Sequence, residues 1–402
     1  MKKIDQISYA KTVYGKEEIE AVLKCLGEST QMGFYSRKFE SEIANLFDKQ
    51  HCLYVNSGSS ALLIGIEACD FEKGSEIITP ALTFSTTVGA ILKSGLIPVF
   101  TDVKPYTYCI DVDQVEDLIS DKTRAILAPN LMGNLCEWEK LRKIADQYNL
   151  ILIEDSADTI GSTLKGDVLS GTYTDISITS FYGSHIINCA GNGGALALND
   201  EKILKKAKLL RSWGRSSSLF DENSESIENR FNVNLEGIEY DAKFVFEEVG
   251  YNLEGNELGA AFGLEQLKKL KNNIASRQIN FKKQINFFNK YQQYFINPIE
   301  NPECKTSWLA FPILIKKEAP FRRREFQIFL EENKVQTRVV FTGNILRQPM
   351  CKGINKRTRK EGYPNSDSIM ERGVLLPLHH GMTAEMFKRL HNCIDEFIAK
   401  KS

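Results

Sequence analysis

The sequence predicts an α/β fold, with a large domain built on a mainly parallel β-sheet between layers of helices and a smaller C-terminal α+β domain. Short, buried-type β-branched runs alternate with amphipathic stretches from residue 51 onward, and this alternation is typical of a parallel sheet covered on both faces. The 402 residues, 42% of them hydrophobic, are enough for a large core and a second domain. The order changes after residue 194, and we expect the domains to be 1–255 and 256–402.

The expected elements of the large domain follow the chain in order. Two helices come first, because apolar residues recur there at helical spacing, and strands that alternate with helices follow. The expected helices are 17–26, 38–47, 61–69, 83–87, 113–118, 137–147 and 201–211, and the expected strands are 51–55, 76–79, 97–101, 125–128, 151–154, 176–179 and 195–198.

The C-terminal part begins with a long connection. A polar stretch from residue 212 to about 240 is too long for a simple connector, which indicates a functional or dimer-contacting insertion. A long helix over 256–270 follows, with apolar residues at roughly helical spacing, and it connects to the small domain. The remaining expected elements are a strand at 308–315, a helix at 321–333, a segment at 335–340 and closing helices at 367–372 and 384–398.

Charge and composition argue against several classes of protein. Fifty-one basic residues balance 52 acidic ones without a basic arm, so we expect no binding to nucleic acid or to a membrane surface. No run approaches the ~18 apolar residues of a membrane span and the start lacks the apolar core of a signal peptide, so we expect a cytoplasmic enzyme. Nine scattered cysteines without a C-x-x-C pair indicate reduced thiols, and the adjacent His379 and His380 would point apart on a strand, so we expect no metal site.

A polar, glycine-punctuated loop at residues 180–194 lies between two expected buried strands and contains His185. Asp155 follows another of these strands, and ligands of parallel α/β sheets bind at such strand ends. The turn Ser-Gly-Ser-Ser at residues 57–60 begins a helix whose free N–H groups suit a phosphate, although a serine cap alone would also explain it. No G-x-G-x-x-G motif begins any of the helices, which argues against a nicotinamide cofactor.

These segments resemble the DegT/DnrJ/StrS family of vitamin B6-dependent sugar aminotransferases, whose loop runs Ser-Phe-x-x-x-Lys and then Gly-Glu-Gly-Gly. The resemblance covers nearly the whole chain and implies a fold-type I, aspartate aminotransferase-like enzyme with pyridoxal 5'-phosphate (PLP) or pyridoxamine 5'-phosphate (PMP) as cofactor. Here His185 occupies the lysine position. A lysine amine forms a Schiff base with pyridoxal whereas an imidazole cannot, so we expect a non-covalent cofactor and a histidine that still transfers protons. An ordinary loop histidine in an inactive relative is the alternative.

The resemblance also implies roles for individual residues. Gly58, Ser59 and Ser180 are expected at the cofactor phosphate, Phe84 against the pyridine ring, Asp155 at the pyridine nitrogen and Asp158 near the phenolic oxygen, where the family usually has glutamine. Asn252, within Gly-Tyr-Asn, is expected to reach the cofactor phosphate of the neighbouring subunit, which implies a homodimer. Arg338 or Arg347 could bind acidic groups of the substrate or amino donor, although a surface arginine explains either position equally well.

Three positions depart from the family pattern. Asn192 replaces the acidic residue before Gly-Gly, Glu254 replaces a basic residue, and residues 183–184 differ from the usual pair before the base. These departures concern sugar binding more than the cofactor.

Within the family, the chain resembles the lysine-free, PMP-dependent branch that includes GDP-4-keto-6-deoxymannose 3-dehydratase. This resemblance implies a lyase of deoxysugar biosynthesis, as for O-antigen lipopolysaccharide. Such an enzyme removes the C3 hydroxyl of a nucleotide-linked 4-keto-6-deoxyhexose to give a 3,6-dideoxy-4-keto sugar, and L-glutamate regenerates PMP. The nucleotide, GDP, CDP or dTDP, stays open.

Three alternatives remain open from the sequence. The chain could be a sugar aminotransferase without the Schiff-base lysine, a dehydrase that takes electrons from a reductase partner, or a non-catalytic pseudoenzyme. Relatives of the second kind carry iron–sulfur cysteines in the loop after a Trp-Gly-Arg. That tripeptide is present at 213–215, but no cysteine occurs from residue 212 to 251, so we expect no iron–sulfur cluster because it requires thiolate ligands.

Overall fold

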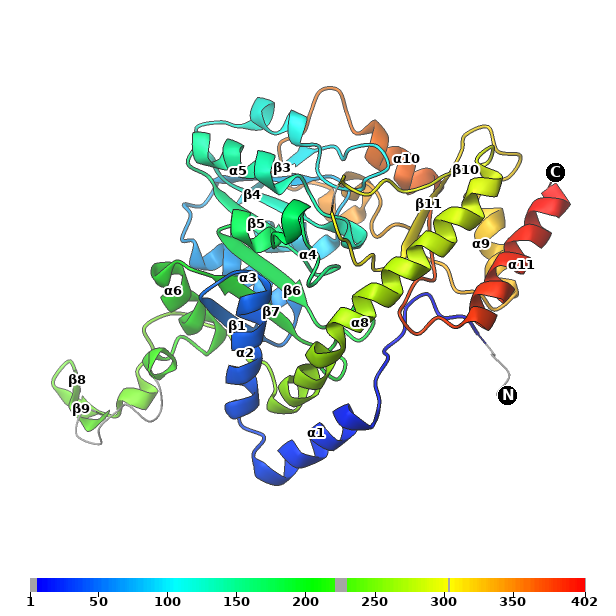
Figure 1. Ribbon diagram of the computed structural model, residues 1–402. Coiled ribbons are helices and arrows are strands. Elements are labelled where there is room, and N and C mark those ends of the chain that lie inside the picture. Colours follow the sequence, from blue (N-terminus) through cyan, green and yellow to red (C-terminus); the bar gives the residue numbers. More distant parts are fainter. Residues whose placement is uncertain (1–5, 221–229, 303, 402) are drawn as a thin grey trace.

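A seven-stranded β-sheet lies at the centre of the computed structural model, which describes residues 6–220, 230–302 and 304–401 (Figure 1). The strand order is β1-β7-β6-β5-β4-β2-β3. The strands are β1 (His51–Val55), β2 (Glu76–Pro80), β3 (Ile97–Thr101), β4 (Thr123–Pro129), β5 (Ile151–Asp155), β6 (Ile176–Ser180) and β7 (Gly194–Leu198). Each expected strand of the large domain is therefore present, with bounds that differ by at most two residues.

The sheet is mixed because β7 runs against its two neighbours. β7 pairs antiparallel with β1 and β6, whereas the other four pairings are parallel. β1 therefore runs in the same direction as β6. As a result, the segments that follow β1, β2, β4, β5 and β6 all leave the sheet at one edge, which we call the carboxyl edge.

Helices cover both faces of this sheet (Figure 1). Consecutive strand residues face opposite layers: Ile77 and Leu127 belong to the core under α3, and Ile78 and Ile126 to the core under α5. The helices around the sheet are α1 (Lys16–Glu28), α2 (Phe34–Leu46), α3 (Gly58–Ala68), α4 (Ser85–Lys93), α5 (Trp138–Gln147) and α6 (Glu201–Arg211). The predicted three-layer α/β architecture is confirmed.

The start of α3 follows directly from the sequence of the turn before it. Ser57 caps the helix, and its Oγ accepts a hydrogen bond of 3.1 Å from the Ser60 N–H. Further along, Gly65 allows α3 to lie close to the sheet, because a Cβ there would be 3.1 Å from Leu196 Cδ1. The helix therefore begins at the carboxyl edge, with its N-terminus next to β6 and β7.

Three predicted elements differ most from the structure, and the helix expected at 83–87 also extends further, because α4 ends at Lys93. Residues 113–118 form two 3-10 turns, Val112–Gln114 and Glu116–Leu118, because so short a segment cannot offset the cost of starting an α-helix. The polar stretch contains a hairpin of β8 (Val233–Leu235) and β9 (Ile238–Tyr240), and part of it lies outside the described residues.

The third difference is the long helix, which was predicted to end near residue 270 but runs as α8 from Glu257 to Phe288. In its second half, the buried face includes the polar residues Arg277, Asn280 and Gln284 beside apolar ones. Arg277 is fully buried, and its Nη1 donates hydrogen bonds of 3.0 Å to the carbonyls of Trp308 and Leu309. Backbone carbonyls accept the hydrogen bonds of Nη1, whereas Arg277 Nε and Nη2 have no hydrogen-bond partner among the described residues. The periodicity of apolar residues does not predict this continuation of the helix.

The C-terminal part contains a smaller three-stranded antiparallel sheet with helices packed against it. Its elements are β10 (Phe295–Ile296), β11 (Phe311–Ile315), β12 (Gly373–Leu376), α9 (Arg323–Glu332), α10 (Pro364–Arg372) and α11 (Ala384–Lys401). Its core also includes Ile7, Leu82 and Leu131 from earlier in the chain. The division at 255/256 stays a prediction.

Within residues 6–220, 230–302 and 304–401, no helix has the length and hydropathy needed to cross a bilayer. In the same ranges, no three His, Cys, Asp or Glu side chains are grouped as metal ligands would be.

Candidate active site

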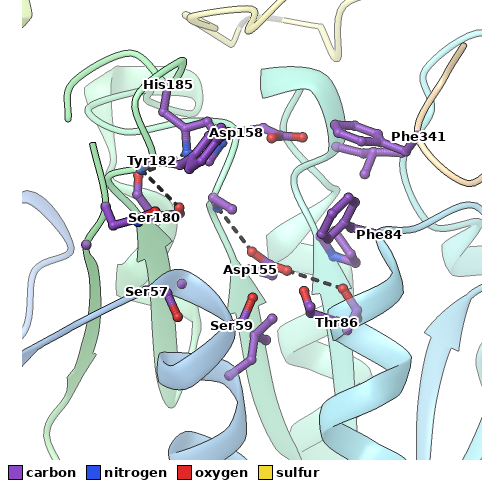
Figure 2. A pocket seen from close by; sticks show the side chains of 18 residues that line it. Ser57, Ser59, Phe84, Thr86, Asp155, Asp158, Ser180, Tyr182, His185 and Phe341 are labelled. Atoms are coloured by element: carbon purple, nitrogen blue, oxygen red, sulfur yellow. Dashed lines mark hydrogen bonds between the residues drawn. The ribbon is translucent and has the colours of Figure 1, made fainter. Parts of the chain in front are cut away.

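A cavity of about 320 Å³ opens at the carboxyl edge of the seven-stranded sheet, next to the N-termini of α3 and α4 (Figure 2). Residues from the ends of β1, β4, β5 and β6 meet there because these strands share one direction. The lining residues are Ser57, Gly58, Ser59, Leu62, Phe84, Thr86, Thr87, Pro129, Leu131, Asp155, Ala157, Asp158, Ser180, Tyr182, His185, Asn192, Gly193 and Phe341.

The N-terminus of α3 gives this cavity an anion-binding end. The first-turn N–H groups of a helix have no acceptor within the helix, and the helix dipole adds positive potential there. Gly58 lies so close to β6 that a Cβ would be 2.7 Å from Ser180 Cβ. The backbone of Gly58 and the hydroxyls of Ser59 and Ser180 therefore converge on one small region.

Asp155 presents a buried carboxylate at the end of β5. Its Oδ1 accepts a hydrogen bond of 3.1 Å from the Ala157 N–H, and its Oδ2 accepts a long one of 3.4 Å from Thr87 Oγ1. Burial raises the pKa of Asp155 to about 6, and these hydrogen bonds only partly offset that effect. A cationic N–H group in the cavity would stabilise this carboxylate.

Asp158 lies one turn further along the same segment and is also buried. Its Oδ2 accepts a hydrogen bond of 2.9 Å from the Met132 N–H. Burial raises the pKa of Asp158 to about 7, and the negative charge of Asp155 acts in the same direction. Two carboxyl groups with raised pKa values in one cavity are typical of a functional site.

His185 faces the two aspartates from the loop between β6 and β7 (Figure 2). Its Nδ1 lies 3.1 Å from the Ser180 carbonyl oxygen, and because a carbonyl only accepts, Nδ1 carries the proton. Nε2 is then the basic nitrogen. Burial lowers the pKa of His185 to about 4, the positive charge of Arg277 adds to this, and the bond to Ser180 opposes it. The imidazole is therefore neutral at physiological pH.

The cavity brings together seven of the residues that the sequence singled out, and no lysine is among its lining residues in the described part of the chain. The seven are Gly58, Ser59, Phe84, Asp155, Asp158, Ser180 and His185. Ser57, Thr86, Thr87 and Tyr182 also line the cavity, and each is within three positions of a residue that was singled out.

Phe341 had no local sequence signal. It lies in the C-terminal part of the chain with a left-handed φ of 44°, and its ring meets Phe84 edge to face at 6.0 Å. The hydroxyl of Thr342 donates a hydrogen bond of 2.6 Å to the Thr83 carbonyl, which holds this segment against the start of α4. Only the packing of distant segments places Phe341 in the cavity.

Asn252, Arg338 and Arg347 lie outside the cavity of their own chain. Asn252 lines a separate cleft with Trp213, and a second copy of the chain would be required for it to reach a cofactor. The guanidinium of Arg347 pairs with Asp367 through bonds of 2.5 and 2.6 Å. Arg338 is more than half exposed, with its guanidinium 5.7 Å from the centre of the Tyr9 ring. The roles expected for these three residues stay predictions.

Comparison with known proteins identifies the family. The family model of the DegT/DnrJ/EryC1/StrS aminotransferases matches residues 13–395. The chain is 32% identical over 396 residues to the lipopolysaccharide biosynthesis protein RfbH of Salmonella typhimurium, covering 96% of this chain and 90% of the relative. It is 33% identical over 380 residues to the dTDP-4-dehydro-2,6-dideoxy-D-glucose 3-dehydratase of Saccharopolyspora spinosa, covering 92% and 81%.

A solved structure extends this similarity to the fold. The GDP-4-keto-6-deoxy-D-mannose-3-dehydratase of E. coli, solved with bound hydrated PLP, superimposes with a TM-score of 0.85 at 28% identity, covering 96% of this chain and 99% of that one. This superposition confirms the predicted fold-type I, aspartate aminotransferase-like architecture.

The residues of the cavity fit a B6 phosphate. The helix N-terminus and its serines suit the phosphate group, and Phe84 offers an apolar ring beside Asp155. No cationic side chain among the described residues pairs with the buried Asp155, and a protonated pyridine nitrogen would provide such a partner. The sequence match and the fold lead to the same conclusion. The chain belongs to the DegT/DnrJ/EryC1/StrS aminotransferase family, a family of PLP-dependent sugar-modifying enzymes.

Proposed function

We propose that this protein is a PMP/PLP-dependent nucleotide-sugar 3-dehydratase. It removes the C3 hydroxyl of a nucleotide-linked 4-keto-6-deoxyhexose to give a 3,6-dideoxy-4-keto sugar, and L-glutamate restores the amine form of the cofactor. The observation that carries the proposal is His185 at the family's lysine position, in a cavity whose lining in the described residues contains no lysine. The 3-dehydratase names of several relatives support it.

The residues around the cavity would hold the cofactor in one orientation. The N–H groups of Gly58 and Ser59 and the hydroxyl of Ser180 bind the phosphate, and Asp155 keeps the pyridine nitrogen protonated. When bound, PMP supplies the reacting amine and an electron-withdrawing ring. Asp158 would lie near the phenolic oxygen of the bound cofactor.

His185 is the proposed acid and base. The hydrogen bond from Nδ1 to the Ser180 carbonyl fixes the tautomer and the ring orientation, which leaves the Nε2 lone pair to accept a proton in the cavity. The same nitrogen then donates that proton to the departing C3 hydroxyl, which leaves as water. A neutral imidazole is the form needed at the start, and burial in the cavity favours that form.

A homodimer is part of the proposal. Asn252 would bind the cofactor phosphate of the other subunit. Apolar side chains next to it in the sequence, Ile238, Phe244, Phe246 and Val249, are more than half exposed, as residues of an interface are in a single protomer. Light scattering should give twice the mass of one chain, and Asn252→Ala should weaken cofactor binding without changing that mass.

The test compares wild-type protein with His185→Lys and His185→Asn. Mass spectrometry of a 4-keto-6-deoxy nucleotide sugar after incubation with PMP and glutamate should show loss of the C3 oxygen with wild-type protein. Both variants should lose this activity by about 1,000-fold or more, as expected for removal of a general base with no replacement. Borohydride should attach the cofactor covalently to His185→Lys only.

Other outcomes would contradict the proposal. An amine gained by the sugar with wild-type protein would identify an aminotransferase. A protein that binds neither PLP nor PMP would be a pseudoenzyme.

A further inference from the structure

The first described residues of the chain connect the small sheet to the loop that contains His185. Residues 6–14, which we call the N-terminal strap, run between the C-terminal part and α1 (Figure 1). The Ile7 N–H donates a hydrogen bond of 2.8 Å to the Lys334 carbonyl, and the Gln336 N–H donates one of 2.9 Å to the Ile7 carbonyl. The strap is therefore held at its start by the small domain.

Further along, the strap contacts residues 181–193, which we call the catalytic loop. The hydroxyl of Thr12 donates a hydrogen bond to the Gly183 carbonyl. A Cβ on Gly183 would lie only 3.3 Å from Thr12 Oγ1, so the Thr12 side chain packs directly against this glycine. Gly183 belongs to a turn in which the His185 N–H donates a hydrogen bond of 2.9 Å to the Tyr182 carbonyl. Thr12 thus holds the turn that orients His185.

A second connection lies on the other side of His185. Gln266 of α8 is buried, and its Nε2 donates a hydrogen bond of 3.1 Å to the Val13 carbonyl. Its Oε1 accepts a hydrogen bond of 3.3 Å from Nδ2 of the buried Asn188. The strap therefore directly contacts the part of the catalytic loop that precedes His185. It is connected to the part that follows His185 through Gln266.

We propose that Thr12 is a positioning residue for His185, acting through the Gly183 carbonyl. With the hydroxyl removed, the Gly183 peptide can rotate, because glycine has no side chain to restrict it. The turn at 182–185 then loosens, and the bond from His185 Nδ1 to the Ser180 carbonyl is lost for part of the time. An error of about 1 Å in the placement of a catalytic group can cost on the order of 100-fold in rate. The expected fall in rate, which is the catalytic half of this inference, depends on the proposed role of His185. The expected change in the orientation of His185, which is the structural half, does not.

The structural half is tested on cofactor-free protein by ¹⁵N NMR of the histidine side chains, with His185→Asn to assign the signal. Wild-type His185 should be the Nδ1–H tautomer and titrate near its lowered pKa of about 4. In Thr12→Val the signal should show a mixture of tautomers. The pKa should rise toward the ordinary 6.5, because hydration of the ring relieves the largest cause of the lowered pKa and outweighs the loss of the Ser180 hydrogen bond, which by itself would lower the pKa. The charged or titratable groups that face His185 in both proteins are Arg277 and the two aspartates of the cavity, Asp155 and Asp158 (Figure 2).

Two further variants control for general damage to the fold. Thr12→Ser keeps the hydroxyl and should give the wild-type NMR signal and rate. Lys11→Ala changes an exposed neighbour in the strap and should do the same. Thr12→Val should lower kcat for dehydration by about 10- to 100-fold with little change in the KM for the sugar.

The possible failures can be distinguished. An unchanged His185 tautomer and pKa in Thr12→Val would overturn the positioning role. The expected NMR change in a protein that dehydrates no sugar would instead contradict the proposed function and leave the structural role of Thr12 in place.

Discussion

The carboxyl edge of the seven-stranded sheet and the C-terminal part of the chain differ in how well local sequence places their candidate residues. At the carboxyl edge, Gly58, Asp155 and Ser180 all line one cavity. In the C-terminal part, neither Arg338 nor Arg347 does. Strands of the same direction bring their ends together whatever their sequence, whereas a long arginine side chain on a loop pairs with whichever acceptor the packing provides.

After the His185 variants, the largest effect at the carboxyl edge is expected for Asp155→Asn. The amide cannot hold the pyridine nitrogen protonated, so kcat for dehydration should fall by about 100-fold or more while the sugar KM changes little. Steady-state kinetics and the absorbance of the bound cofactor measure this effect. Asp146→Asn, which changes an exposed carboxylate on α5, is the matched control and should behave as wild type. A rate within about threefold of wild type would show that Asp155 takes no part in the reaction.

Gly58→Ala tests the phosphate end of the cavity. Its Cβ would meet Ser180 Cβ at 2.7 Å, so α3 and β6 must move apart and the phosphate contacts should weaken. We expect cofactor affinity to fall by about 10- to 100-fold in calorimetric titrations, since both backbone and hydroxyl contacts are displaced.

Gly89→Ala in α4 is the control for this substitution, because nothing lies within 4 Å of its Cβ position. It should stabilise the helix by about 0.5–1 kcal/mol and leave cofactor binding unchanged. If Gly58→Ala bound PLP as tightly as Gly89→Ala, the phosphate would bind elsewhere.

Asp158→Asn should change how stability depends on pH. The folded-state pKa of about 7 lies above the ordinary 3.8, so in wild type this carboxyl contributes stability that is fully present below pH 3.8 and is lost as the pH rises through 7. Asparagine does not titrate, and its side-chain oxygen can still accept the Met132 N–H. The variant should therefore gain on the order of 2–4 kcal/mol relative to wild type between pH 4 and pH 8.

Urea denaturation of cofactor-free protein at several pH values measures this difference. A constant difference between the two proteins across that range would show that burial does not raise the pKa of Asp158.

The smallest effect is expected for Arg347→Gln in the C-terminal part. Its ion pair with Asp367 is largely exposed, so its loss should cost about 1 kcal/mol or less and change the KM for glutamate and for the sugar by less than about threefold. Arg124→Gln, another partly exposed arginine that lies outside the cavity lining, is the control. A tenfold rise in either KM for Arg347→Gln alone would show that this residue reaches the substrate, and the contrast between the two regions would then be wrong.

The sequence alone determined the α/β architecture and seven of the 18 residues that line the cavity. Each strand is a short run of β-branched and apolar residues, and each functional residue near a strand end is placed by its immediate neighbours, as Ser57 places Gly58 and Ser59 at the start of α3. His185 was found the same way, since the loop around it keeps the family's pattern. Local signals of this kind do not depend on the rest of the fold.

Only the tertiary structure decided which distant segments complete the site. Phe341 meets Phe84, and Thr12 bonds Gly183, across more than 170 positions of sequence that no periodicity connects. The second half of α8 likewise buries Arg277, whose Nη1 bonds to carbonyls of other segments. These contacts form between segments that only the packing of the whole chain brings together, and the free energy that selects them comes from burial shared by many residues rather than from any local pattern.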